Sequence, residues 1–181
     1  MPGRPTKLLD LEGLMNYAAR ALTSRALSLN ELRDRLKRRA SRQEDVTEVV
    51  ARLKEAGFLN DRKLADSFAN WRRENLGLGK ARVVHDLMAR RIAPAVAKQA
   101  AEAAYSGVDE VDLIESFLAR KYRGKNLGEL LGEEKHLASA FRRLRGAGFS
   151  AGNSIRVLKR YASEADRLED MPEEIDETKE Q

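Results

Sequence analysis

GFLNDRKLADSFANWRRENLGLGKARVVHDL, residues 57–87, is the stretch that decides the fold. Gly57 suits the position just after a helix, and Asn60 is a good N-cap for the next one. Gly77 and Gly79 then interrupt that helix before a basic segment with helical spacing begins. The stretch therefore predicts short helices separated by glycine breaks, with no strand among them.

Large apolar residues within this stretch predict a buried face. Leu64, Phe68 and Trp71 follow the i, i+4, i+7 spacing that places side chains on one side of a helix. This spacing favours a core position for Trp71, and the alternative is an exposed ring that stacks on a base. We also expect Phe58 and Phe149, each of which follows a glycine, to lie in the core.

Similar helical patterns continue on both sides. Ser28 and Glu31 have the spacing of a capping box before a helix with Leu36. The middle helices of three successive groups centre on Leu36, Leu87 and Phe141, which are 51 and 54 residues apart. Such regular spacing is typical of a repeat protein.

The predicted fold is all-α: an elongated tandem array of three three-helix repeats followed by a disordered acidic tail. A short turn over residues 127–131 interrupts the third repeat. The expected boundaries are a flexible N-terminus at 1–13, repeats at 14–59, 60–107 and 108–163, and the tail at 164–181.

Composition limits the classes of protein that this sequence can form. The 181 residues contain no cysteine, so disulfides and thiolate metal sites are excluded. We find no apolar run near the roughly 18 residues of a membrane span, and the start, MPGRPTK, lacks the apolar region of a secretory signal. These features predict a cytoplasmic protein with no membrane contact.

Charge is distributed unevenly along the chain. Residues 162–181 hold nine acidic and two basic residues, whereas residues 1–161 hold 32 Lys and Arg against 20 Asp and Glu. A basic body favours a polyanionic partner, although exposed basic helix faces are also common for solubility alone. The candidate residues for such contacts are Lys37, Arg38, Arg72, Arg73, Lys80, Arg82, Arg90, Arg142 and Arg143.

Two patterns resemble enzyme or metal motifs but lack essential members. Gly77-x-Gly79-Lys80 has Glu74 where a phosphate-binding loop needs its first glycine, and no strand precedes it. Glu133 and His136 have the spacing of a carboxylate-histidine metal site, but the chain has no second copy, which favours a surface pair. We therefore predict no catalytic residues, no cofactor and no metal, and a protein that is not an enzyme.

Three sequence elements together resemble a known family. The first is YAARALTSRALSLNELRDRLKRR, residues 17–39, and the second is the stretch from Gly57 through Phe58, Leu59 and Asp61 to Gly79 and KARVVHDLMARR. The third is GAGFSAGNSIRVLK, residues 146–159. They resemble the RecX family of regulators of the bacterial recombinase RecA, and the resemblance covers about residues 14–163. Arg91 stands where this family usually has glycine.

This resemblance implies a partner and a function. The protein is expected to bind the RecA filament as a monomer, with weak contact to single- or double-stranded DNA. It would mostly inhibit filament growth, strand exchange and ATP hydrolysis, and so restrain recombination and the SOS response. The alternatives are a helical nucleic-acid-binding protein that acts alone and an adaptor that binds only protein.

Overall fold

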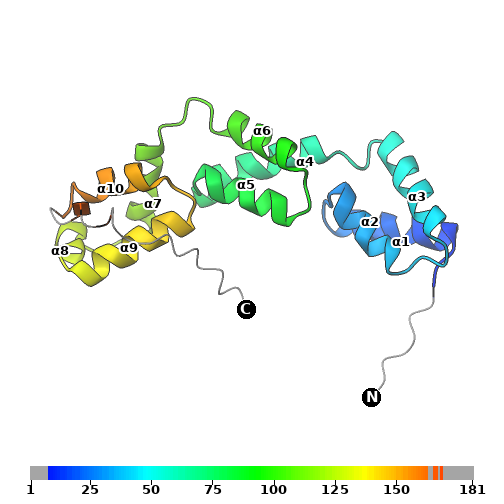
Figure 1. Cartoon of the computed structure of the whole chain (residues 1–181), viewed down its shortest axis with the longest axis horizontal. Helices are drawn as coiled ribbons and strands as arrows, with labels where there is room; N and C mark the ends of the chain where they lie inside the picture. Colours follow the sequence, from blue (N-terminus) through cyan, green and yellow to red (C-terminus); the bar gives the residue numbers. More distant parts are fainter. Residues whose placement is uncertain (1–7, 163–164, 167, 169–181) are drawn as a thin grey trace, which may run out of the picture. The chain divides into compact units, whose positions relative to one another are not determined.

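The computed structural model describes residues 8–162 together with 165, 166 and 168. Within them the chain forms helices only, apart from one isolated bridge in which Leu9 pairs with Ala40 (Figure 1). The helices are α1 Leu11–Ser24, α2 Leu29–Lys37, α3 Gln43–Glu55, α4 Asp61–Trp71, α5 Lys80–Ala89, α6 Pro94–Ala104, α7 Glu110–Lys121, α8 Leu127–Leu131, α9 Glu134–Gly146 and α10 Ala151–Leu158, with a π-helical turn, η1 Arg72–Leu76, after α4. The all-α prediction is confirmed.

The described chain divides into two compact units. The first contains the residues up to 68 together with 86–100, and the second contains 69–85 together with the residues from 101 onward. Helices α1 to α6 agree in number and order with two predicted three-helix repeats, and the third set has a short additional helix, α8. The boundaries of the three repeats stay a prediction.

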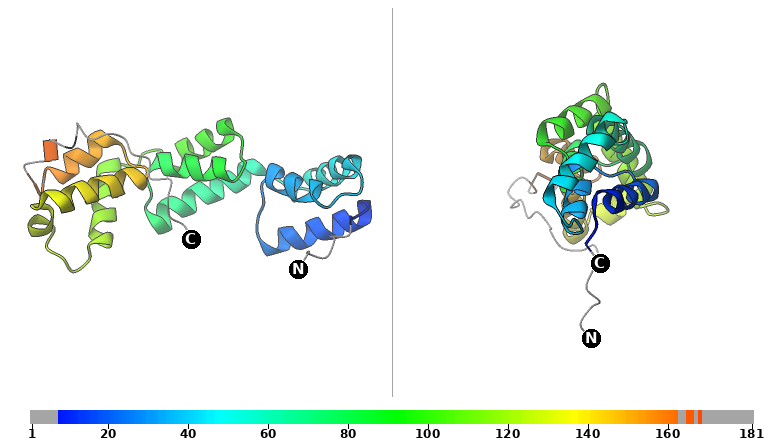
Figure 2. Two further views of the ribbon diagram at one scale, coloured as in Figure 1. Left: turned by 60° about the horizontal axis from the view of Figure 1, so that its bottom comes forward. Right: turned by 90° about the vertical axis from the view of Figure 1, so that its right-hand side faces the viewer.

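The first unit has an apolar core built by α1, α2 and α3. Both α1 and α2 pack on α3, as the views in Figure 2 show. Leu14, Leu32, Leu36 and Val49 are completely buried there, and Leu32 and Leu36 have the i, i+4 spacing that places both on one helix face. The helix ends follow from local sequence, because Asp10 caps α1, and Ser28 and Glu31 form the predicted capping box at α2.

The second unit has its own apolar core, to which Phe149 belongs. Helix α10 packs against both α7 and α9, and the Phe117 and Phe149 rings meet edge to face with centroids 5.5 Å apart. Phe149 is 1% exposed, which confirms its predicted core position. Ala165 and Leu168 also belong to this core, so the predicted disordered tail, residues 164–181, was wrong at these two positions. Most of that tail, including residues 169–181, lies outside the described residues.

Two of the expected core aromatics are exposed instead. Trp71 is 52% exposed and Phe58 is 68% exposed, so both predictions were wrong. The buried face of α4 runs through Ala65 and Ala69, and Trp71 lies about 200° around the helix from Ala69. After Gly57, which has a φ of +78°, Leu59 rather than Phe58 enters the core.

Candidate functional site

Two of the predicted contact residues lie on an exposed face at the end of α2. Lys37 and Arg38 are exposed because Leu32 and Leu36 occupy the opposite, buried face of the helix. Arg38 is held in place locally, since its Nε donates a hydrogen bond to the carbonyl oxygen of Asp34 at 3.2 Å. Both cationic groups are therefore accessible to a partner.

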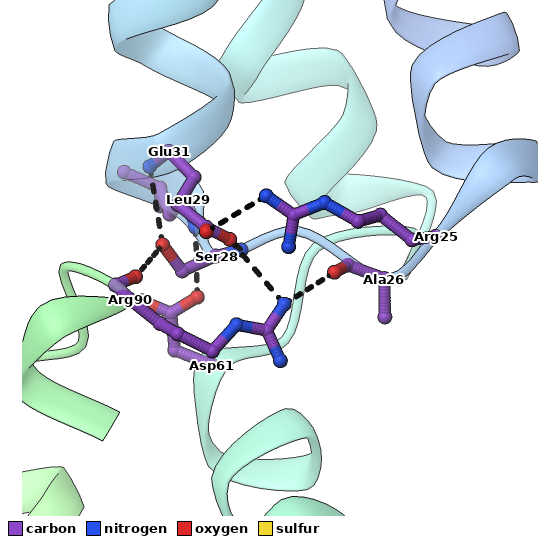
Figure 3. Close-up of polar contacts among 7 residues, drawn as sticks. All are labelled: Arg25, Ala26, Ser28, Leu29, Glu31, Asp61 and Arg90. Carbon is purple, nitrogen blue, oxygen red and sulfur yellow. Dashed lines mark hydrogen bonds and ion pairs between the residues drawn. The ribbon is translucent and has the colours of Figure 1, made fainter. Parts of the chain in front are cut away.

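Arg90 has a different environment from the one the sequence suggested. Its guanidinium donates to the carbonyl oxygen of Ala26 at 2.6 Å and approaches Glu31 to 3.4 Å (Figure 3). It also lies over the Phe68 ring, 5.4 Å from the centroid, and its side chain is only 20% exposed. The expected outward position of Arg90 is thus not observed, because the side chain holds segments of the first unit together.

The same polar cluster joins the start of α2 to two distant segments of the chain. The buried Ser28 hydroxyl donates to the carbonyl oxygen of Arg90 at 2.7 Å. The Asp61 carboxylate accepts from the backbone N–H of Leu29 at 2.8 Å (Figure 3). The capping box was predicted from the sequence, but the contacts of Asp61 and Arg90 with the start of α2 were not, because both residues are remote from it in sequence.

Glu31 is held in its charged form by this cluster. Burial raises the pKa of Glu31, but the Ser28 N–H, the Arg25 hydrogen bond and the charges of Arg90 and Arg25 together lower it below its ordinary value of 4.5. The Arg25 contact measures 3.0 Å between guanidinium nitrogen and carboxylate oxygen. The cluster therefore contains a carboxylate whose ionisation stabilises the first unit.

In the second unit, three predicted contact residues have internal partners. Arg73 donates to the carbonyl oxygen of Ala104, and Lys80 forms an ion pair with Glu102. Arg82 donates to the carbonyl oxygen of Gly146 at 3.4 Å. These partners position the side chains within the unit, so any contact with another molecule would compete with them.

Close backbone packing explains the glycines before α5. Gly79 donates its N–H to the carbonyl oxygen of Ala147 at 2.8 Å. A Cβ at position 79 would lie 2.2 Å from the Gly148 oxygen, and one at position 148 would lie 2.2 Å from the Arg82 nitrogen. The Gly77-x-Gly79 pattern thus brings two turns together rather than forming a phosphate-binding loop.

The other candidates lie at the surface of the second unit or partly buried within it. Arg142 and Arg143 are exposed on α9, and the Arg143 guanidinium lies 5.8 Å from the Tyr122 ring centroid. Arg72 is half-buried and lies 6.0 Å from the exposed Trp71 ring centroid. His136 and Glu133 form the expected surface pair, 3.3 Å apart. The functional roles of all nine candidate residues stay predictions.

Two bases that the sequence analysis did not select lie beside Lys37. Arg33 is on the same side of α2, four residues earlier, and Arg91 belongs to the turn between α5 and α6. All three line one cleft of the first unit. The i, i+4 spacing of Arg33 and Lys37 was a usable signal, whereas nothing in the sequence places Arg91 near them.

Comparison with known proteins identifies the family. No protein-family model matches the chain. The protein named Regulatory protein RecX from Amycolatopsis mediterranei is 30% identical over 158 residues, which cover 82% of this chain and 85% of the relative. The chain belongs to the RecX family. The Regulatory protein RecX from Deinococcus radiodurans is 42% identical over 90 residues, but this match spans only 42% of that relative's length.

A solved structure agrees with the fold of this RecX chain. The crystal structure of RecX from Lactobacillus salivarius superposes with a TM-score of 0.61 at 18% identity, covering 83% of this chain and 96% of the other. At that identity the likeness concerns the fold alone. Among the described residues of this RecX chain, no helix is long and apolar enough to cross a membrane.

Proposed function

We propose that this RecX-family chain regulates RecA by binding the recombinase filament, with DNA as a secondary contact. The observation that carries the proposal is the match to the Amycolatopsis RecX, which spans more than four-fifths of both chains. The exposed bases Lys37, Arg38, Arg142 and Arg143 support it, because they offer contacts to a filament that contains a polyanion. The proposed effect is mostly inhibition of filament growth, strand exchange and ATP hydrolysis.

The test is RecA-dependent ATP hydrolysis on single-stranded DNA, with the full chain added well below one copy per recombinase. We expect inhibition, because one regulator bound to a filament affects many subunits. Order-of-addition experiments with excess DNA exclude simple sequestration of the strand. No effect even at a molar excess of folded protein would overturn the proposal.

A second measurement, binding to naked DNA over a range of salt concentrations, separates the other two functions. A helical nucleic-acid-binding protein that acts alone would bind naked DNA tightly, with strong salt dependence, and would change RecA turnover only by competing for the strand. An adaptor that binds only protein would show no salt-sensitive DNA binding. The proposed regulator should instead bind naked DNA modestly and prefer the filament.

A further inference from the structure

An open cleft of about 550 Å³ lies between α2 and the turn that joins α5 to α6. Its lining includes three basic side chains, Arg33 and Lys37 from α2 and Arg91 from the turn, against one acidic side chain, Asp34. The apolar groups Met88, Ile92 and Pro94 line it as well. Two chain segments more than fifty residues apart thus bring their cations to one place.

The backbone at Arg91 is unusual. Its φ of +61° lies in the left-handed region, and among the described residues it is the one residue other than glycine found there. Its N–H donates to the carbonyl oxygen of Met88 at 2.9 Å, closing α5 in the position that glycine normally takes. The fold therefore places a charged side chain where a residue without a side chain would fit with less strain.

The cations of the cleft are weakly neutralised. Arg91 approaches Asp34 to 3.6 Å, but their side chains are 67% and 37% exposed, and exposed pairs of this kind contribute little. Arg33 donates to the Asn30 side chain at 3.3 Å, an interaction with a neutral group. The segment 33–39 holds five bases and one acid, so positive charge continues along α2 beyond the cleft.

We propose that this cleft binds the phosphodiester backbone of a nucleic-acid strand through Arg33, Lys37 and Arg91. Guanidinium groups donate to phosphate oxygens in pairs, and a line of bases suits a ligand with regularly repeated negative charges. The apolar lining, in which Met88 is 44% exposed, offers contact to the sugars between phosphates. This inference rests on the proposed function and deepens it, because it assigns the DNA contact to a particular cleft.

The test measures the affinity of the full chain for a labelled oligothymidylate and for a labelled duplex, by fluorescence anisotropy over a salt series. Lys37→Gln and Arg91→Gly should each weaken binding several-fold. Each should also reduce the slope of log affinity against log salt, by roughly 0.7 for a single strand and 0.9 for duplex. Asp34→Asn should strengthen binding, because it removes the only carboxylate among the residues that line the cleft.

Lys54→Gln is the matched control. Lys37 and Lys54 are both exposed lysines in the last turn of a helix of the first unit, but Lys54 does not line the cleft. Lys54→Gln should leave the salt slope unchanged. Arg91→Gly should stay folded, because glycine accepts a φ of +61°, and circular dichroism checks this.

Three results would overturn the proposal. The first is no measurable oligonucleotide binding by the unmodified chain at low salt, and the second is equal behaviour of Lys37→Gln, Arg91→Gly and Lys54→Gln. The third is that Lys37→Gln and Arg91→Gly bind the oligonucleotides as the unmodified chain does but bind polyglutamate more weakly. That result would assign the cleft to an acidic protein segment. If the unmodified chain leaves RecA turnover unaffected while cleft variants lose oligonucleotide binding, the regulatory function fails and the cleft proposal stands.

Discussion

At the scale of single residues, the approach of Gly79 to Gly148 leaves no room for a side chain. The neighbour of an added Cβ at position 79 is a backbone oxygen 2.2 Å away, which cannot rotate aside. We expect Gly79→Ala to lower the free energy of unfolding by about 3 kcal/mol. Urea unfolding followed by circular dichroism measures the change.

Gly152→Ala is the control for that substitution. Gly152 lies in α10, and nothing stands within 4 Å of an added Cβ. Alanine is the better helix former, so this variant should gain about 0.5–1 kcal/mol. Equal stability changes of the two variants would contradict the steric explanation for Gly79.

Single residues also show what the sequence could and could not predict. The capping box of Ser28 and the end of α3 just before Gly57 depend on neighbours within a few positions, and both were predicted correctly. The exposure of Trp71 and the internal contacts of Arg90 depend on which helix face is covered by residues distant in the chain. The spacing of apolar residues predicts that α4 is a helix, but it does not tell whether the alanine face or the aromatic face of that helix is buried.

At the scale of elements, Ser28 both caps α2 and hydrogen bonds to the Arg90 carbonyl 62 residues away. Ser28→Ala removes the cap and leaves a carbonyl oxygen without this donor, so we expect a loss of about 2 kcal/mol in the free energy of unfolding. Thermal and urea unfolding of the variant measure this loss.

Asp109→Ala provides the comparison, because Asp109 is an exposed N-cap of α7 that accepts from the Val111 N–H. It should cost only about 1 kcal/mol, the usual value of a cap. If Ser28→Ala costs no more than Asp109→Ala, the hydrogen bond to Arg90 adds nothing measurable.

The candidate site was also predicted only in part. The basic residues of α2 could be recognised from the sequence, but the cleft beside α2 could not, because the turn between α5 and α6 that forms its other side is remote in sequence.

At the scale of the whole molecule, the described part of each unit holds a carboxylate whose pKa is lowered, Glu31 in the first and Glu110 in the second. Glu110 resembles Glu31 in this respect: burial raises its pKa, but hydrogen bonds from Ser150 and Asn153 and the charge of Arg145 lower it below 4.5. The Asn153 contact measures 2.6 Å. Ionisation of Glu31 and of Glu110 therefore stabilises the folded state in both units.

The two lowered pKa values make the protein less stable in acid. A carboxyl with a lowered folded-state pKa contributes fully above its unfolded value of about 4.5 and loses that contribution as the pH falls through the folded value. We expect the contribution of these two carboxylates to the free energy of unfolding to be constant above about pH 5 and to fall at lower pH. Glu31→Gln and Glu110→Gln should each make this acid limb shallower, as measured by urea unfolding at a series of pH values, whereas an unchanged limb would contradict the prediction.

Because of the left-handed backbone at position 91, stability and positive charge in the cleft favour different residues there. Glycine at this position would relieve the conformational strain, while arginine supplies a charge to the cleft. In a library randomised at codon 91, enrichment by heat challenge should favour glycine, and enrichment by retention on immobilised oligonucleotide should favour arginine. The residue enriched at position 91 would then show whether a given selection rewards stability or oligonucleotide binding.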